Sequence, residues 1–223
     1  MQRLNRRATL AGLGAMSLLS ALPASAGTAA RDFAIRLDGD EIGEQSVRVQ
    51  RIGQVVQVDI AIDIRVRILG ISAYRYEMTN RELWRDGAVQ SIASRTNDNG
   101  TDHRVTAERE SGGLRIAGTG FSGTIPGDVA TTTYWTEEFL ARRTWINTQD
   151  GTPLSVTASR LGAAELMLDS GPVACTKWRT GGDLALELYY DRNGEWLANR
   201  FEARGEKAVI LAKSRDQQLT ALW

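Results

Sequence analysis

Residues 56–68 constrain the fold more than any other stretch, because a β-branched residue occupies every second position. Polar or small residues fill the positions between them. Alternation with a period of two puts one set of side chains on each face of a β-strand, which a helix cannot do. The branched residues are Val56, Val58, Ile60, Ile62, Ile64, Val66 and Ile68.

The length of this stretch limits the kinds of sheet that can contain it. Thirteen residues at about 3.4 Å each give a strand of about 44 Å, whereas strands usually have about five to six residues. Right-handed twist accumulates along such a strand, so its apolar face is covered only if the sheet curls over it. We therefore predict a mainly β fold with a curled antiparallel sheet, either a half-barrel or a barrel.

Residues 1–26 have the three regions of a cleavable export signal. Arg6 and Arg7 supply the charged region, an apolar run of about 15 residues follows, and Ala24-Ser25-Ala26 is an A-x-A cleavage site. The run is shorter than the roughly 20 residues that span a bilayer. We expect cleavage near Ala26 and a periplasmic location, and the paired arginines favour the twin-arginine route over the general secretory route.

The remaining residues, 27–223, suit a single β domain. The whole chain has 27 basic and 27 acidic residues, and three arginines lie in the export signal, so 24 basic residues remain against 27 acidic ones. There is no basic tract and no alternation of basic with aromatic residues, so we expect no nucleic-acid partner. We expect only transient membrane contact, and a monomer.

Turn sequences divide the domain into short strands. Asp38-Gly39, Asp86-Gly87 and Asn99-Gly100 are typical of two-residue hairpin turns, because glycine adopts the positive φ that such turns need. Later in the chain, Gly162 is expected to separate two strands, at 154–158 and 164–168. The glycine-rich residues 118–128 are expected to form a mobile loop.

One short helix is predicted over residues 136–143. Thr136 can cap it, and its acidic and basic residues lie at the ends that the helix dipole favours. Such a helix is too short to be stable alone, so we expect it to pack on the open face of the curled sheet. There it would act as a lid, and its neighbourhood supplies the candidate ligand contacts, which are Tyr134, Trp135, Phe139 and Leu140.

The sequence has few residues for catalysis or metal binding. His103 is the only histidine and Cys175 the only cysteine, so the usual zinc ligand sets cannot form. No G-x-S-x-G motif marks a nucleophilic serine, and His103 is expected on the surface of a hairpin. Cys175 is expected to be a buried thiol rather than a reactive or dimer-forming one. We predict no catalytic residue, metal or cofactor, and leave open whether the protein is an enzyme.

Several features occur together in one order: an export signal, meandering strands, a short aromatic helix after a glycine-rich loop, and a Tyr-Tyr-Asp-x-x-Gly-x-Trp turn at residues 189–196. This order resembles uncharacterised families of bacterial periplasmic proteins that are often exported by the twin-arginine route. These families are similar in pattern to the lipoprotein-carrier half-barrels of Gram-negative bacteria. The resemblance implies a half-barrel that is lidded by helices and holds acyl chains.

Two functions fit these features. In the first, a non-enzymatic periplasmic protein holds a lipid or other amphiphile in its curled sheet, where about 14 buried methylenes at about 0.8 kcal/mol each would supply the affinity. In the second, an envelope structural or assembly factor uses an exposed edge strand to extend a partner protein's sheet. A filled interior would speak against the first function.

Overall fold

The computed structural model describes residues 27–68, 71–203, 205–214 and 217–223. In these residues, fifteen strands form one sheet and two short 3-10 helices, η1 (Glu137–Ala141) and η2 (Thr220–Leu222), accompany it. The strands are β1 (Thr28–Leu37), β2 (Asp40–Ile52), β3 (Val55–Ile68), β4 (Ile71–Arg85), β5 (Ala88–Asp98), β6 (Thr101–Glu110), β7 (Gly113–Gly118), β8 (Ser122–Ile125), β9 (Ala130–Thr131), β10 (Thr144–Ile146), β11 (Pro153–Leu168), β12 (Gly171–Gly182), β13 (Glu187–Tyr190), β14 (Trp196–Ala203) and β15 (Glu206–Ala212).

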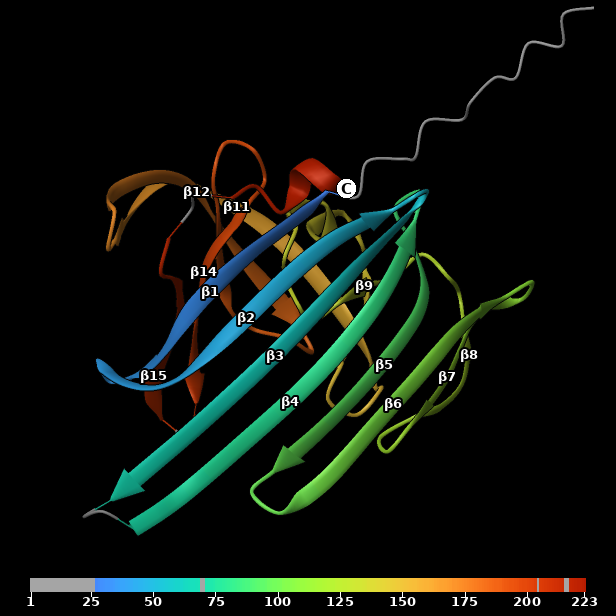
Figure 1. Ribbon diagram of the computed structural model, residues 1–223, viewed down its shortest axis with the longest axis horizontal. Coiled ribbons are helices and arrows are strands. Elements are labelled where there is room, and N and C mark those ends of the chain that lie inside the picture. The colour runs from blue at the N-terminus through green and yellow to red at the C-terminus, as the bar shows by residue number, and fades with distance from the viewer. Residues whose placement is uncertain (1–26, 69–70, 204, 215–216) are drawn as a thin grey trace, which may run out of the picture.

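The strands form a single curled layer that does not close (Figure 1). Their order runs from β8 down to β1, continues into β15, and then descends to β9. The first and last strands in sequence, β1 and β15, therefore lie side by side near the middle of the sheet. Neighbouring strands are antiparallel except for β9 and β10, which are parallel. The predicted mainly β, curled sheet is confirmed, and it is a half-barrel because β8 and β9 remain its two ends.

The long alternating stretch forms β3, as predicted. Val56, Val58 and Ile60 are at most 4% exposed and lie in the core. The β3–β4 hairpin extends beyond its neighbours (Figure 1), because β2 pairs with β3 only as far as Ile64 and β5 pairs with β4 only as far as Tyr76. The apolar face of the long strand is covered along only part of its length, since Ile62, Ile64 and Val66 are only partly buried.

The predicted two-residue turns are confirmed. Asn99 and Gly100 have φ angles of 50° and 95°, and Asp38-Gly39 and Asp86-Gly87 likewise have two positive φ angles each. Two consecutive positive φ angles define the turn type whose twist matches that of the flanking strands. These turns fix the registers of three hairpins and therefore decide which side chains face the core.

Two sequence-based predictions about loops are wrong. The two strands expected around Gly162 are one strand, β11, which passes this residue through a β-bulge rather than a turn. The φ angle of 123° at Gly162 is one that glycine adopts readily and that a bulge can use. Within the expected loop at 118–128, residues 122–125 form β8, because the chain folds back and pairs with β7.

The predicted export signal, with Arg6, Arg7 and Ala26, lies outside the described residues. Within the described ranges, no helix is both long enough and apolar enough to cross a membrane.

Candidate functional site

The predicted helix at 136–143 is present in a shorter form, as η1. The Thr136 hydroxyl caps it as expected, accepting a hydrogen bond from the Glu138 backbone N–H at 3.4 Å. Arg142 already has an extended backbone, with φ −94° and ψ 141°. The helix ends before this residue, so the basic residues at 142 and 143 lie outside it, and the prediction that they occupy its last turn is wrong.

The aromatic residues of this segment lie in the core on the inner face of the sheet. Trp135 and Phe139 are completely buried, and their rings meet edge to face at a centroid distance of 5.9 Å. Phe139 also stacks on Trp84 of β4 at 5.1 Å, and Leu140 packs against the same core from a partly buried position. Three of the four candidate ligand residues are thus gathered in one cluster, where the two aromatic rings have no exposed surface.

Tyr134, the fourth candidate, has an unusual backbone. Its φ angle is 59°, a left-handed conformation that is rare for a bulky side chain. Its ring lies near Trp145 and Trp196 at centroid distances of 6.0 and 5.8 Å, and its carbonyl accepts a hydrogen bond from the Tyr190 hydroxyl at 2.9 Å. Burial raises the pKa of the Tyr134 phenol, so it stays neutral. Strained residues of this kind concentrate at functional sites.

Glu82 places a carboxyl group next to the aromatic cluster with no exposed surface. Asn80 Nδ2 donates to it at 2.9 Å, Trp84 Nε1 at 2.8 Å and the Thr131 hydroxyl at 3.2 Å. Burial raises the pKa of Glu82, and these donors only partly oppose the shift. The carboxyl therefore joins β4 to β9 and holds a proton more tightly than an exposed glutamate would.

The raised pKa of Glu82 predicts a pH dependence of stability. The folded protein keeps the proton above the ordinary value of 4.5, so the free energy of unfolding falls as pH rises from 4.5 toward the folded-state pKa. Glu82→Gln should abolish this fall and be within about 1 kcal/mol of the wild type at pH 4.5. Asn80 can accommodate the amide by turning over, because its Oδ1 has no partner among the described residues. Urea unfolding of both proteins between pH 4.5 and 8 tests this, and parallel curves would contradict it.

A pocket of about 670 Å³ opens beside η1, and we call it the mouth pocket. Trp223 covers one side of it, donating its indole N–H to Glu138 Oε2 at 2.6 Å and meeting the rings of Trp135 and Trp84 at 4.7 and 5.2 Å. The pocket therefore contacts the cluster that contains Trp135 and Phe139. Its lining consists of Val56, Trp84 and Trp223, the charged residues Arg51, Arg85, Asp86 and Glu138, and the turn residues Gly53, Gln54 and Gly87.

A larger groove of about 720 Å³ crosses the opposite face of β2 to β6. Its lining includes side chains that alternate with core residues, such as Asp63, Glu77 and Arg95. Asp63 and Glu77 each form an ion pair with Arg65. Charged and polar side chains dominate this lining, as they dominate that of the mouth pocket, and Ile62 and Met78 are its larger apolar members.

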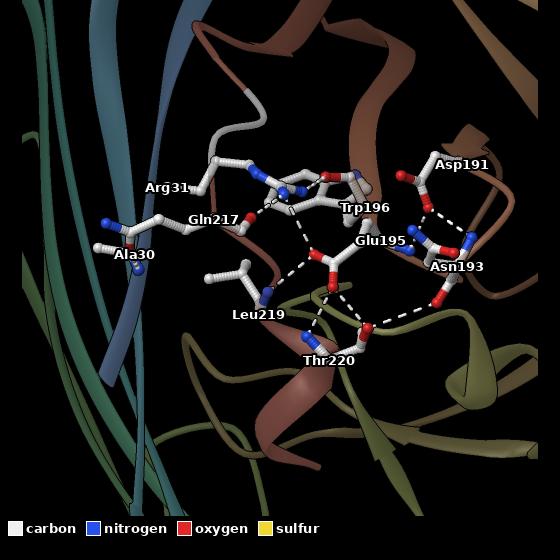
Figure 2. Close-up of polar contacts among 9 residues, drawn as sticks. All are labelled: Ala30, Arg31, Asp191, Asn193, Glu195, Trp196, Gln217, Leu219 and Thr220. Carbon is white, nitrogen blue, oxygen red and sulfur yellow. Dashed lines mark hydrogen bonds and ion pairs between the residues drawn. The ribbon is translucent and has the colours of Figure 1, made fainter. Parts of the chain in front are cut away.

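A buried ion pair holds residues 217–223 against the sheet (Figure 2). Arg31 Nη2 of β1 lies 3.2 Å from Glu195 Oε2, and both side chains are 1% exposed. Glu195 accepts hydrogen bonds from the backbone N–H groups of Leu219 at 3.0 Å and Thr220 at 2.7 Å. Arg31 donates to the Gln217 carbonyl at 2.6 Å. These contacts direct the chain toward the mouth pocket, where Trp223 lies.

The two residues singled out for their rarity lie away from the mouth pocket lining. Cys175 is buried, as predicted, and burial raises the pKa of its thiol. His103 is half-buried on β6, with Nδ1 3.3 Å from the Thr119 hydroxyl.

Sequence reasoning missed Trp84, Trp223, Arg31 and Glu195. Trp84 could have been found, because pairing β3 with β4 puts it opposite Val56 on the core face. The ion pair joins residues 164 positions apart, and no local pattern predicts such a contact. The position of Trp223 depends on the same long-range contact.

The fold and site define a β-barrel-like protein with one curled, unclosed sheet and an aromatic core at its mouth. Residues 33–213 match the family model "Domain of unknown function (DUF6134)", and the chain belongs to this family. Its structure is similar to the crystal structure of a β-barrel-like protein of the domain of unknown function DUF1849 from Brucella abortus. The TM-score is 0.55 at 12% identity, over 82% of this chain and 94% of that one, so the similarity concerns the fold alone. No curated protein matches the chain.

Proposed function

We propose that this protein binds a lipid or other amphiphile in the mouth pocket without catalysing a reaction. The composition of the pocket carries the proposal, since the partly exposed ring of Trp223 lies next to a charged rim, and Val56 and Trp84 are buried directly behind it. An amphiphile fits this arrangement, with its chain against Trp223 and its polar head at the rim. The volume of about 670 Å³ lies within the range of about 300 to 1,000 Å³ that is usual for ligand sites.

The affinity of such binding depends on the polar head as well as on the apolar chain. Burying about ten methylenes at about 0.8 kcal/mol each gives about 8 kcal/mol before the cost of association is subtracted. A dissociation constant in the micromolar range corresponds to a net of about 8 kcal/mol. Micromolar binding of a chain of that length therefore requires contacts between its head and the charged rim that offset the cost of association.

The proposal includes a periplasmic location after twin-arginine export. Its support is the sequence of residues 1–26, with Arg6 and Arg7 before an apolar run and a cleavage site ending at Ala26. The order of sequence features also resembles that of lipoprotein-carrier half-barrels, and a carrier of that kind would work between the envelope membranes. Contact with a membrane would then be transient, and the protein would act as a monomer.

Tryptophan quenching by 9,10-dibromostearic acid tests the proposal. Bromine atoms quench indole fluorescence on contact, and Trp223 lines the pocket with a partly exposed ring. We expect saturable quenching by the brominated acid and none by stearic acid itself, which should compete for the same site. Quenching that does not saturate, or that stearic acid fails to reverse, would reject the mouth pocket as the site.

We infer a second candidate function, that of an envelope assembly factor, from the free edge of β11. β10 pairs only with Pro153–Ser155, and beyond the N–H of Val156 no strand of the described chain covers that edge. Two large apolar side chains are exposed along it, Leu161 at 46% and Met167 at 66%. Long exposed edges of this type are templates for another strand.

Site-specific photo-crosslinking distinguishes this second function. A photoreactive amino acid at Met167 should crosslink one defined partner in cells, and the additional substitution Leu161→Lys should remove that product. The same amino acid at Ile52, which is 52% exposed on a different hairpin, serves as the control. Identical products from both positions would exclude β11 as a specific docking edge.

A further inference from the structure

The segment at 217–223 is held much more firmly at its beginning than at its end. Figure 2 shows the backbone of Leu219 and Thr220 bound to Glu195, which is itself paired with Arg31. The Leu219 side chain has no exposed surface. The first part of the segment is therefore an anchor built from buried polar contacts.

Trp223, at the other end, is held by weaker and more exposed contacts. Its side chain is partly exposed, and its indole N–H donates to Glu138, an exposed residue, at 2.6 Å. Its ring meets Trp135 at 4.7 Å, Trp84 at 5.2 Å and Phe139 at 6.4 Å. Aromatic pairs of this kind contribute about 0.5 to 1.5 kcal/mol each beyond their area, so Trp223 can leave while the anchor stays in place.

The rings beneath Trp223 cannot be left uncovered. Trp84, Trp135 and Phe139 are completely buried, and exposing them to water would cost roughly 25 cal/mol for each Å². An apolar chain that replaced the indole would keep them covered. The indole would be released into a site that is already open to solvent, because the mouth pocket lies beside it.

We propose that the apolar chain of the ligand binds in the place of the Trp223 side chain, directly against Trp84, Trp135 and Phe139. The inference rests on the proposed amphiphile binding and specifies where the chain lies. Trp223 then competes with the ligand from within the protein, and the candidate residues Trp135 and Phe139 become ligand contacts only when it moves. Glu195 and Arg31 keep the segment attached, so the indole can return when the ligand leaves.

The test compares the affinity of Trp223→Ala and wild-type protein for dibromostearic acid. Removing the competing indole should tighten binding about tenfold, equivalent to one or two aromatic pairs. Trp178→Ala is the matched control, because Trp178 is also half-buried and donates its indole N–H to Glu137 of the same helix at 2.7 Å. Its affinity should equal that of the wild type.

The other outcomes separate the inference from the proposed function. If Trp223→Ala binds with unchanged or weaker affinity while the wild type binds saturably, Trp223 is a passive wall and the inference is wrong. If no protein binds the acid, the proposed function fails as well.

A second measurement uses the wild-type sequence and therefore does not depend on whether a variant folds. With 5-fluorotryptophan incorporated, stearic acid should move the Trp223 ¹⁹F resonance toward the position of free tryptophan. An unmoved resonance at saturation would also overturn the inference.

Discussion

Replacing Glu195 with alanine should lower the free energy of unfolding by about 3 to 5 kcal/mol, the usual cost of removing one partner from a buried ion pair. Arg31 would keep its charge at a position where its side chain is 1% exposed. The N–H groups of Leu219 and Thr220 would lose their acceptor as well. Urea denaturation at neutral pH, with equal slopes for both proteins, measures the difference.

A surface ion pair provides the control for this variant. Arg36 and Glu41 lie 3.9 Å apart with side chains 42% and 50% exposed. Glu41→Ala should change the free energy of unfolding by less than about 1 kcal/mol, because water screens exposed pairs. Equal losses for Glu195→Ala and Glu41→Ala would show that the buried pair does not anchor residues 217–223.

Trp84→Ala should cost about 3 to 5 kcal/mol of stability, the range for truncating a buried aromatic residue. Trp84 has no exposed surface, stacks on Phe139 and donates to Glu82 at 2.8 Å. The substitution would therefore open a cavity and remove one donor from a buried carboxyl. Ligand binding should weaken as well, because Trp84 is one of the rings against which we propose that the ligand's chain binds when Trp223 moves.

Trp84→Phe separates the two roles of this side chain. Phenylalanine keeps most of the aromatic packing but cannot donate to Glu82, so we expect a loss of about 1 to 3 kcal/mol, as for a buried group left without a hydrogen bond. Differential scanning calorimetry of both variants provides the comparison. If alanine and phenylalanine destabilised the protein equally, packing of the indole would not be the main contribution.

The sheet could be predicted from sequence because the patterns that specify its strands and turns lie within short stretches of the chain. Alternation over residues 56–68 identifies the longest one-sided strand, and turns such as Asn99-Gly100 set the register of the hairpins beside it. One wrong prediction about the sheet also arose at a single position. Gly162 could mark either a turn or a bulge, and only the pairing of β11 with β12 decides between them.

The candidate site could be predicted only in part. An aromatic segment next to a capped helix predicted that this helix packs on the open face of the curled sheet as a lid, and in the structure Trp135 and Phe139 are completely buried in the core. The sequence could not indicate that Trp223, 84 positions after Phe139, lies over the same rings. That contact depends on the ion pair of Arg31 with Glu195, whose partners come from β1 and from the turn before β14.

Amphiphile binding is tested most directly by mass spectrometry of an organic extract from the protein. The full chain should be expressed with its own signal, and the exported protein purified from the periplasm without detergent. We predict one acyl-bearing species in near-stoichiometric amount, and its loss after delipidation should be reversed by adding stearic acid. A well-folded protein that yields an empty extract and takes up no stearic acid would contradict amphiphile binding and leave the β11 edge as the remaining candidate.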